Sequence, residues 1–422
     1  MKPFASFFGL PIGISFTAWA IVGLTRLLFE KIKKITTPVT NKRLKYKASD
    51  IAVVIAAHNE EIVIRRCIQA LKQSLKPRQI YVVSDGSNDR TYMRARLEGC
   101  HASALNPGRG KARALKYLFQ RYNLFTKYKF IFIVDADTRI DKDFVKNALP
   151  LFEDTQVGVI FGAVRISWQQ HIIPKLSYYY ISYRERLGRS LQYFLAYGQT
   201  WKYTNVNYVI PGFATIYKSK ILKQLEIDTP GLLIEDFNLA FQVHRKKICK
   251  IGFATSSIGW DQHPDNLFDY WKQVRRWNIG FFQTVKKNGV WPSFFWLTLL
   301  IFSLEVGINS LFILILPLVL FLKTLPLITS VHPIFAGINS FYQSFDVFGY
   351  LSSWDILFGT FIFDYIFTII MAYVVRKPQL LFYGLFFFFM HYITSLILLS
   401  SIIPGFFGKS AGRWTSPKRY KN

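Results

Sequence analysis

The sequence predicts an α/β domain built on a mostly parallel sheet, preceded by one N-terminal membrane helix and followed by an α-helical membrane bundle. Short, continuously apolar, β-rich runs alternate with helix-like stretches between about residues 50 and 163, which is typical of a parallel sheet with crossover helices. Long apolar runs lie toward both ends of the chain, where they predict membrane segments. Positive charge beside those runs predicts which flanks are cytoplasmic.

The composition limits the classes of function. The 422 residues suffice for one soluble domain and several membrane helices, and 51% are hydrophobic. Lys and Arg total 53 against 25 acids, a formal charge of +28. No nucleic-acid-recognition motif accompanies this charge, so we expect no nucleic-acid partner. The positive charge indicates a cytoplasmic surface that lies on anionic lipid and a site for a negatively charged nucleotide, although a generally basic proteome would produce this charge too.

Cys67, Cys100 and Cys249 lack metal-ligand spacing and are expected to be reduced.

The first apolar run, residues 4–29, predicts a membrane helix in segment 1–30. Residues 31–47 contain seven Lys or Arg and no acid. The positive-inside rule therefore places segment 31–49 in the cytoplasm as a basic linker. A cleaved signal peptide is the rival interpretation, but no small-residue cleavage site precedes the basic segment.

The elements of the α/β domain follow in order. Ile51–Ala56, Ile80–Ser84 and Phe130–Val134 predict strands buried on both faces, and Glu61–Leu71 and Lys111–Tyr122 predict the helices between them. Ligands in such sheets bind at the carboxyl ends of the strands, where the polar motifs of this sequence lie.

Beyond residue 290 the chain is predominantly apolar. The runs 293–322, 356–375 and 380–403 are each long enough to cross a bilayer, and we expect an additional crossing within 333–351 because the basic tail should be cytoplasmic. The predicted domains are a cytoplasmic domain, an amphipathic interface helix, a membrane bundle and a basic cytoplasmic tail, at residues 50–277, 278–292, 293–405 and 406–422.

The first two polar motifs suit a nucleotide. Asp85, at the tip of the second strand, can accept hydrogen bonds from ribose hydroxyls or a base N–H, although an ordinary helix cap would use the same residues. Lys111 lies near the end of the segment Asn106–Ala112. The glycines of this segment and the expected start of a helix favour the binding of a phosphate group. A plain basic loop accounts for this segment equally well, and it lacks P-loop spacing.

Asp135 and Asp137 follow the buried strand Phe130–Val134. In an extended chain, residues two apart point to the same side, so the two carboxylates would repel one another without a cation. Their hard oxygens suit Mg²⁺ or Mn²⁺, with a diphosphate completing the coordination. A solvated turn is the alternative.

Two further motifs complete the set. Glu235 and Asp236 are candidates for a general base, although an acid pair at a helix start is also stabilised by the helix dipole. Gln273, Arg276 and Trp277 would share one helical face, with Arg stabilising a leaving diphosphate and Trp stacking on a sugar. Alternatively, Arg276 and Trp277 only anchor a helix at the membrane interface.

In this order the motifs resemble the membrane-embedded processive synthases of glycosyltransferase family 2, such as the cellulose, chitin, hyaluronan and poly-N-acetylglucosamine synthases. The resemblance implies a GT-A-type domain in an inverting enzyme. It implies Asp236 as base, with Glu235 and Arg276 also catalytic, and a metal on Asp137 and Asp135. Gly212, Phe213 and Trp277 would contact the acceptor. The implied donor contacts are Ala57, His58, Glu60, Asp85, Lys111, Asp135, Asp137, Gln273, Arg276 and Trp414.

The chain departs from that pattern at three positions. His58 stands where family members commonly carry Tyr or Phe, Ile234 replaces Thr before Glu-Asp, and Ala214 replaces a second Gly. None of these changes removes an essential charge, although they bear on base stacking and on the fit of the sugar.

The predicted function is polymerisation of a UDP-sugar, with UDP-GlcNAc the first choice, into a β-linked polysaccharide exported through the protein's own channel. Expected partners are the UDP-sugar, the growing polysaccharide, the lipid bilayer and an accessory membrane subunit. The expected location is the plasma (inner) membrane, multi-pass, with the catalytic domain cytoplasmic. The alternatives are a non-processive enzyme that adds one or a few sugars to a lipid, and an inactive nucleotide-sugar-binding pore subunit.

Overall fold

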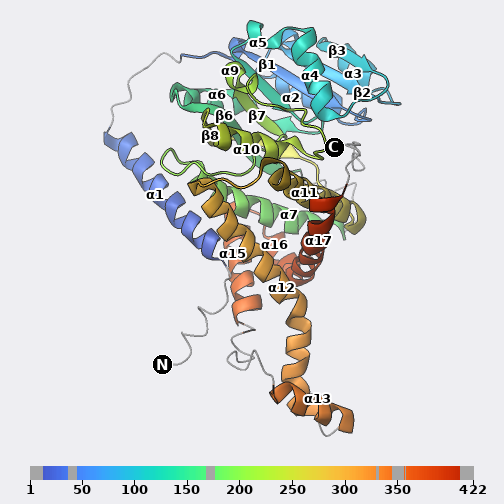
Figure 1. Cartoon of the computed structure of the whole chain (residues 1–422). Coiled ribbons are helices and arrows are strands. Elements are labelled where there is room, and N and C mark those ends of the chain that lie inside the picture. Colours follow the sequence, from blue (N-terminus) through green and yellow to red (C-terminus); the bar gives the residue numbers. More distant parts are fainter. Residues whose placement is uncertain are drawn as a thin grey trace. The chain divides into compact units, whose positions relative to one another are not determined.

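The computed structural model describes residues 13–36, 45–167, 176–328, 332–344, 356 and 358–408 (Figure 1). The chain divides into two compact units. The larger comprises Phe16–Leu299 and Ser401–Asn422, and the smaller comprises Met1–Ser15 and Leu300–Ser400. The α/β fold belongs to the larger unit.

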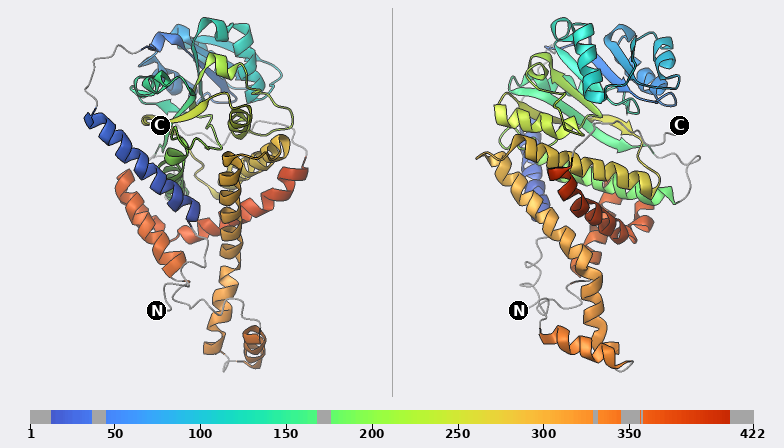
Figure 2. Two further views of the ribbon diagram at one scale, coloured as in Figure 1. Left: turned by 60° about the vertical axis from the view of Figure 1, so that its left-hand side comes forward. Right: turned by 45° about the vertical axis from the view of Figure 1, so that its right-hand side comes forward.

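The larger unit contains one eight-stranded mixed sheet of order β3-β2-β1-β4-β7-β6-β8-β5 (Figures 1 and 2). The pairs β1–β2, β2–β3, β1–β4 and β6–β8 are parallel, whereas β4–β7, β6–β7 and β5–β8 are antiparallel. The strands are β1 Ile51–Ala57, β2 Ile80–Asp85, β3 His101–Leu105, β4 Phe130–Val134, β5 Arg139–Ile140, β6 Val157–Ile166, β7 Ala214–Lys218 and β8 Lys250–Asp261. The prediction of a mostly parallel sheet therefore holds for the first half of the fold, and the second half adds antiparallel pairs.

The α-helices of the larger unit connect and cover these strands. Their bounds are α2 Ile64–Lys72, α3 Thr91–Leu97, α4 Lys111–Arg121, α5 Leu124–Lys127, α6 Phe144–Ala148, α7 Ser177–Ser190, α8 Tyr197–Gln199, α9 Ser219–Leu222, α10 Glu235–Lys246 and α11 Leu267–Asn288, with a π-helical turn, η5, at Leu191–Ala196 between α7 and α8. The predicted strands at 51–56, 80–84 and 130–134 and the two predicted helices are confirmed within one or two residues at most ends, although α2 begins only at Ile64.

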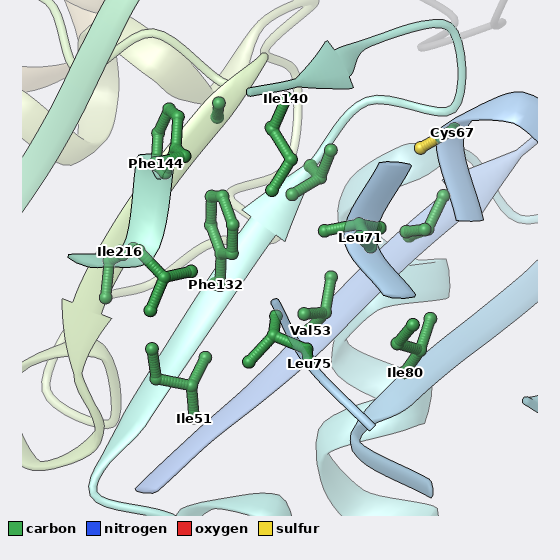
Figure 3. Close-up of a cluster of buried hydrophobic side chains, with 14 of the residues drawn as sticks. Ile51, Val53, Cys67, Leu71, Leu75, Ile80, Phe132, Ile140, Phe144 and Ile216 are labelled. Atoms are coloured by element: carbon green, nitrogen blue, oxygen red, sulfur yellow. The ribbon is translucent and has the colours of Figure 1, made fainter. Parts of the chain in front are cut away.

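Two hydrophobic layers sandwich the parallel half of the sheet. Because alternate residues of a strand face opposite sides, Ile51, Val53 and Ile55 of β1 pack with α2, whereas Ala52 and Val54 pack with α4. Figure 3 shows the first layer, in which the rings of Phe132 and Phe144 stack with centroids 5.0 Å apart. A strand buried on both sides needs apolar residues at consecutive positions, which is why these strands read as unbroken apolar runs.

Helix α1, Ile14–Thr36, extends past the predicted end at residue 30 into the basic linker. From Phe16 onward it belongs to the larger unit, where Arg26 donates to the carbonyl oxygen of Tyr197 at 2.8 Å. Gly198 permits the close approach, since a Cβ there would lie 2.5 Å from the carbonyl oxygen of Trp19. Side chains such as Leu24 and Leu28 are exposed. Helix α1 is not among the described helices that are long and apolar enough to span a membrane.

The smaller unit is helical. Its α-helices are α12 Phe294–Ile328, α13 Pro333–Ser344, α15 Phe363–Val375, α16 Gln379–Gly384 and α17 Phe387–Phe407, where α12 begins and α17 ends in the larger unit. By length and composition, two of the described helices, α12 and α17, could span a membrane. Helix α13 has 12 residues and occupies the first part of segment 333–351, in which an additional crossing is predicted. Residues 345–351 lie outside the described residues. The predicted run 380–403 is divided between α16 and α17.

Candidate active site

A cavity of about 630 Å³ opens within the larger unit. Its wall includes the residues before α4, the turn after β4, the segment before β7, the start of α10 and one face each of α7 and α11. Of the residues predicted for the site, eleven line this cavity: Glu60, Lys111, Asp135, Asp137, Gly212, Phe213, Glu235, Asp236, Gln273, Arg276 and Trp277. Residues separated by more than two hundred positions in the sequence thus share one pocket.

Asp135 and Asp137 occupy a turn and not the extended segment that the sequence suggested. The N–H of Thr138 donates to the carbonyl oxygen of Asp135 at 3.0 Å, and the N–H of Asp135 donates to the carbonyl oxygen of Phe213. Both side chains still line the cavity, because the turn begins directly at the end of β4. The prediction of a carboxylate pair facing one site therefore holds, with a different local geometry.

Lys111 connects the acids. Its Nζ lies 2.9 Å from Oδ1 of Asp135 and 2.8 Å from Oε1 of Glu235. We call Asp135, Glu235 and Asp236 together with Lys111 the acidic centre. Burial alone would lower the pKa of Lys111, but the three carboxylates outweigh it and raise that pKa. For Glu235 the balance is the reverse: burial raises its pKa, Lys111 lowers it more, and the net pKa lies below the ordinary value.

Asp236 is the second residue of α10. The N–H of Gly212 donates to its Oδ2 at 3.0 Å, which fixes the carboxylate against the segment before β7. Burial and the neighbouring charge of Glu235 raise the pKa of Asp236 to about 7. A carboxylate with a pKa near neutrality is suited to accept and release a proton at physiological pH.

Gly212 is required by this arrangement. A Cβ at that position would lie 2.7 Å from Oδ1 of Asp236 and 2.7 Å from Nζ of Lys111. Any larger side chain would push apart the two charged groups that the centre brings together. Gly212 therefore has a structural role that the sequence did not reveal, in addition to the acceptor contact that stays a prediction.

Asp85 lies at the end of β2, as predicted, and its carboxylate binds the backbone of a neighbouring loop. It is 2% exposed, and its two carboxylate oxygens accept from the backbone N–H groups of Arg109 and Gly110, each at 2.7 Å. It thereby holds the loop that ends in Lys111, and it is not among the residues that line the cavity. His58 likewise lies behind the wall, with Nδ1 2.6 Å from the carbonyl oxygen of Asp85, and Ala57 is buried at the end of β1.

Helix α11 carries the Gln-x-x-Arg-Trp element. Asn266 caps this helix by accepting from the N–H of Asp269, and the helix continues without a break to Asn288. The boundary predicted between 277 and 278 therefore falls inside one helix. Gln273, Arg276 and Trp277 all face the cavity, as their spacing predicted. The charge of Arg276 helps to lower the pKa of Glu235. Among the described residues, Oε1 of Gln273 is buried without a hydrogen-bond partner.

The sequence analysis missed helix α7 and the π-helical turn η5 that follows it. Arg184, Glu185, Gly188, Arg189 and Gln192 line the cavity, and their spacing is that of one helical face. The guanidinium of Arg184 lies over the ring of Trp277, 4.7 Å from its centroid. That contact covers one face of the indole. Asp261 and His263, at the end of β8, also line the cavity and were not predicted.

The donor set fits a divalent cation only in part. Asp135 and Asp137 supply hard carboxylate oxygens at a strand end, as Mg²⁺ or Mn²⁺ requires. Within the described ranges, no group of three or more His, Cys, Asp and Glu side chains is arranged to hold a metal ion. Such a site suits a cation that shares its coordination with substrate phosphates, as Mg²⁺ commonly does. Trp414, the remaining predicted donor contact, lies outside the described residues.

Comparison with known proteins agrees with this geometry. Residues 48–280 match the model of the family described as glycosyltransferase-like family 2. The chain is 28% identical over 242 residues to the probable glycosyltransferase YdaM of Bacillus subtilis (strain 168), covering 54% of each chain. It is 25% identical over 166 residues to the β-monoglucosyldiacylglycerol synthase of Synechocystis sp. (strain ATCC 27184 / PCC 6803 / Kazusa), covering 35% of this chain and 33% of that protein. The chain thus spans about half or less of the length of these curated relatives.

A solved structure shares the fold. The mannosyltransferase of Pyrobaculum calidifontis, determined with GDP-mannose and Mn²⁺, superposes with a TM-score of 0.51 at 14% identity, covering 94% of this chain and 99% of that chain. The prediction of a GT-A-type α/β domain in a glycosyltransferase is confirmed by the family match and the fold. The chain belongs to glycosyltransferase-like family 2, whose matched region contains the acidic centre and the Gln-x-x-Arg element.

Proposed function

We propose that the protein transfers a sugar from a nucleoside diphosphate sugar, with UDP-sugars the first choice, to an acceptor hydroxyl with inversion at the anomeric carbon. One observation carries the proposal: Asp236, with a pKa of about 7, is held by Gly212 beside a lysine-bridged pair of acids in the cavity. A single displacement needs a base whose pKa lies near neutral pH and a positive charge that can bind the leaving diphosphate.

In this displacement the acceptor oxygen forms a bond to the anomeric carbon as the bond from that carbon to the diphosphate oxygen breaks. Asp236 takes the proton of the acceptor hydroxyl, and the nucleoside diphosphate leaves with the bonding electrons. Arg276, whose charge also acts on Glu235, is available to stabilise the departing charge. Oε1 of Glu235 lies 2.8 Å from Nζ of Lys111 and holds this ammonium group in the cavity, where its positive charge can also stabilise the departing diphosphate.

Mg²⁺ or Mn²⁺, held by Asp135 and Asp137, would neutralise the diphosphate when bound. The resemblance of the Asp-x-Asp motif favours Asp137 as the principal ligand, and Asp135 contacts Lys111 at 2.9 Å. The chain's own residues then divide the work: Lys111 and Arg276 bind the diphosphate, and Asp236 manages the proton.

For the acceptor we propose a growing β-linked polysaccharide, with UDP-GlcNAc as donor and export through the membrane part of the chain. The order of the motifs supports this proposal, as does the wall position of Trp277, a residue type that stacks on sugar rings. The apolar helices α12 and α17 support a location in the inner membrane, and the basic segments support a cytoplasmic catalytic domain.

Transfer of one or a few sugars to a lipid is the second candidate. The cavity wall supports it, because Leu191, Leu195, Leu232 and Leu233 provide aliphatic surface next to the polar centre. The name of one relative, a β-monoglucosyldiacylglycerol synthase, points to the same class of acceptor.

Membranes containing the protein, supplied with labelled UDP- and GDP-sugars and with Mg²⁺ or Mn²⁺, test both candidates. A ladder of long products from a UDP-sugar supports the polysaccharide synthase, and a single lipid-extractable product supports the lipid enzyme. Trp277→Ala should shorten the polymer more than it weakens UDP binding. Unchanged product length in this variant would remove the stacking role, and use of GDP-sugars alone would remove the assignment of UDP.

A further inference from the structure

Helix α10, which carries the two acids of the cavity, begins without a side-chain cap. Its N-cap residue is Ile234, in an extended conformation, and an aliphatic side chain cannot accept a hydrogen bond from the first N–H groups of a helix. Glu235 and Asp236 are the first two residues of this helix. Gly212 holds Asp236 from the side of β7. From the other side, helix α11 holds the segment that leads into α10.

Gln283 makes the first of these contacts. This residue of α11 is 7% exposed, and its Oε1 accepts from the backbone N–H of Leu233 at 3.0 Å. Leu233 comes directly before Ile234, so the bond fixes the chain just ahead of α10. A hydrogen bond that is shielded from water is costly to leave unmade, which keeps this segment against α11.

Gly280 makes the second contact, one turn before Gln283 on the same face of α11. A Cβ at Gly280 would lie 2.9 Å from Cγ1 of Ile234, 3.0 Å from its Cβ and 3.1 Å from its Cδ1. Because glycine has no side chain, the helix can approach Ile234 this closely. The position of Ile234, and with it the start of α10, is therefore matched to the missing side chain.

Further contacts continue along the same two helices. The rings of Phe281 and Phe237 meet edge to face with centroids 5.4 Å apart, and Phe237 lines the cavity directly after Asp236. Nδ2 of Asn288 donates to Oδ1 of Asn238 at 2.9 Å. We call this set of contacts the α10–α11 junction. Its residues are Leu233, Ile234, Phe237 and Asn238 on one side and Gly280, Phe281, Gln283 and Asn288 on the other.

The α10–α11 junction connects groups with different tasks in the proposed reaction. Helix α11 is continuous, so Arg276 and Trp277 share one element with Gly280 and Gln283. The charge of Arg276 helps to lower the pKa of Glu235, which shows that groups of the two helices act on one another. Because small misplacements between catalytic groups cost reaction rate, a contact that sets this spacing bears on catalysis.

We infer that Gly280 and Gln283 are positioning residues, which set the place of Asp236 relative to Arg276 and Trp277 by holding the entry to helix α10. The inference rests on the transferase function proposed above and adds two residues to that reaction. Neither Gly280 nor Gln283 is among the residues that line the cavity, so each acts through the acids and not on the substrate.

Steady-state kinetics of the full chain in a neutral detergent test the role of Gly280. Gly280→Ala should lower kcat about tenfold or more, whereas the KM for the donor and the calorimetric affinity for UDP should change less than about twofold. Alanine favours a helix more than glycine does, so weaker helix formation in α11 cannot explain such a loss. Gly307→Ala in α12, where the added methyl group meets no atom within 4 Å, is the matched control.

A second substitution, opposite the new methyl group, should restore the rate. Ile234→Ala removes Cγ1 and Cδ1, two of the three atoms that a Cβ at Gly280 would meet. The variant that combines Gly280→Ala with Ile234→Ala should therefore have a kcat within about threefold of that of Ile234→Ala alone. If the combined variant instead shows the full loss of Gly280→Ala on top of that of Ile234→Ala, the inference is overturned.

Gln283→Met tests the hydrogen bond, because it removes the acceptor of the Leu233 N–H and keeps a side chain of similar length. It should lower kcat while leaving the KM for the donor unchanged, and it decides the inference if the thermal midpoint shows that Gly280→Ala does not fold. Wild-type kcat in either folded variant overturns the role of that residue. A lower thermal midpoint with unchanged kcat has the same meaning, since a purely structural contact would produce it.

A cycle with Asp236→Asn separates this inference from the assignment of the base. If Gly280 acts through Asp236, then adding Gly280→Ala to Asp236→Asn should lower the residual rate less than about twofold. A further loss as large as that in wild type overturns the inference and leaves the proposed function standing. Full turnover in Asp236→Asn alone rejects the base instead, and the rescue by Ile234→Ala then still reports whether the junction positions the start of α10.

Discussion

Two sets of charged residues line the cavity, and they differ in the groups that hold them. In the acidic centre, Lys111 contacts Asp135 and Glu235 within 2.9 Å, and Gly212 binds Asp236. On helix α7, Arg189 donates to the neutral groups of Val164, Gln192 and Tyr193, and Glu185 is an acid whose charge acts on it. Groups that must stay in fixed geometry during a reaction are held by the protein, as Lys111, Glu235 and Asp236 are here.

The largest effect should come from removing the proposed base. Asp236→Asn keeps an oxygen that can accept from Gly212, but an amide cannot take the acceptor proton. Transfer should fall by roughly 10²- to 10⁴-fold, the usual contribution of general acid–base catalysis. UDP affinity, measured by calorimetry, should stay within a few-fold. Asp154→Asn, an exposed change outside the cavity, is the control, and surviving turnover in Asp236→Asn would assign the base elsewhere.

Next in size is the loss of close approach at Gly212. Gly212→Ala places a methyl group 2.7 Å from both Asp236 and Lys111, so the acidic centre must open. We expect kcat to fall about a hundredfold, since small misplacement of catalytic groups has effects of this order. Gly337→Ala, where the added methyl group meets no atom within 4 Å, is the matched control. Wild-type kcat in Gly212→Ala would show that the centre is not tightly assembled.

The pH dependence sharpens the comparison further. If Asp236 acts as the ionised base, kcat/KM should rise with pH through the pKa of about 7, because the protonated form is inactive. Glu235 raises that pKa and Lys111 lowers it, so Glu235→Gln should move the acidic limb to lower pH and Lys111→Met should move it to higher pH. The shifts, in opposite directions, should each be about one unit, roughly tenfold in kcat/KM on the limb. If the acidic limb stays in place in both variants, or moves in the same direction in both, the coupling of Glu235 and Lys111 to the pKa of Asp236 is contradicted.

The smallest effect concerns stability outside the cavity. Burial lowers the pKa of His244 to about 4, and its ring stacks on Phe295 with centroids 4.4 Å apart. Because the folded pKa lies below the unfolded value near 6.5, the stabilisation is complete above pH 6.5 and is lost as pH falls toward 4. This linkage amounts to at most roughly 3 kcal/mol. The thermal midpoint of wild type should therefore fall more steeply between pH 7 and pH 5 than that of His244→Gln. Equal slopes would refute the assignment.

Local sequence patterns predicted the residues at strand ends well. A short apolar run followed by acids is typical of a buried strand with polar residues at its end, so the sequence predicted β4 and Asp135 together. The spacing of Gln273, Arg276 and Trp277 likewise predicted their shared helical face. The end of α11 was misplaced, although Gly289, with a φ of 66°, is a helix-terminating signal that the sequence contains.

Contacts between segments that are distant in the chain could not be predicted from the sequence. Nothing in the pattern around Asp85 shows that its carboxylate binds the backbone of the loop before α4. Lys111 was predicted as a donor contact, but its bridge between Asp135 and Glu235 depends on the packing of α4 and α10 against the sheet. Arg184 and Arg189 of α7 were missed because they lie in a basic, aromatic stretch without a motif, and only the fold brings them to the wall of the cavity.

The configuration of the product tests the central claim most directly. Proton NMR of the first-formed glycoside, recorded before any anomerisation, reports whether the anomeric centre has inverted. A single displacement with Asp236 as base predicts a β-linked product from an α-linked donor. An α-linked product would require a mechanism other than one displacement and would contradict the role assigned to Asp236.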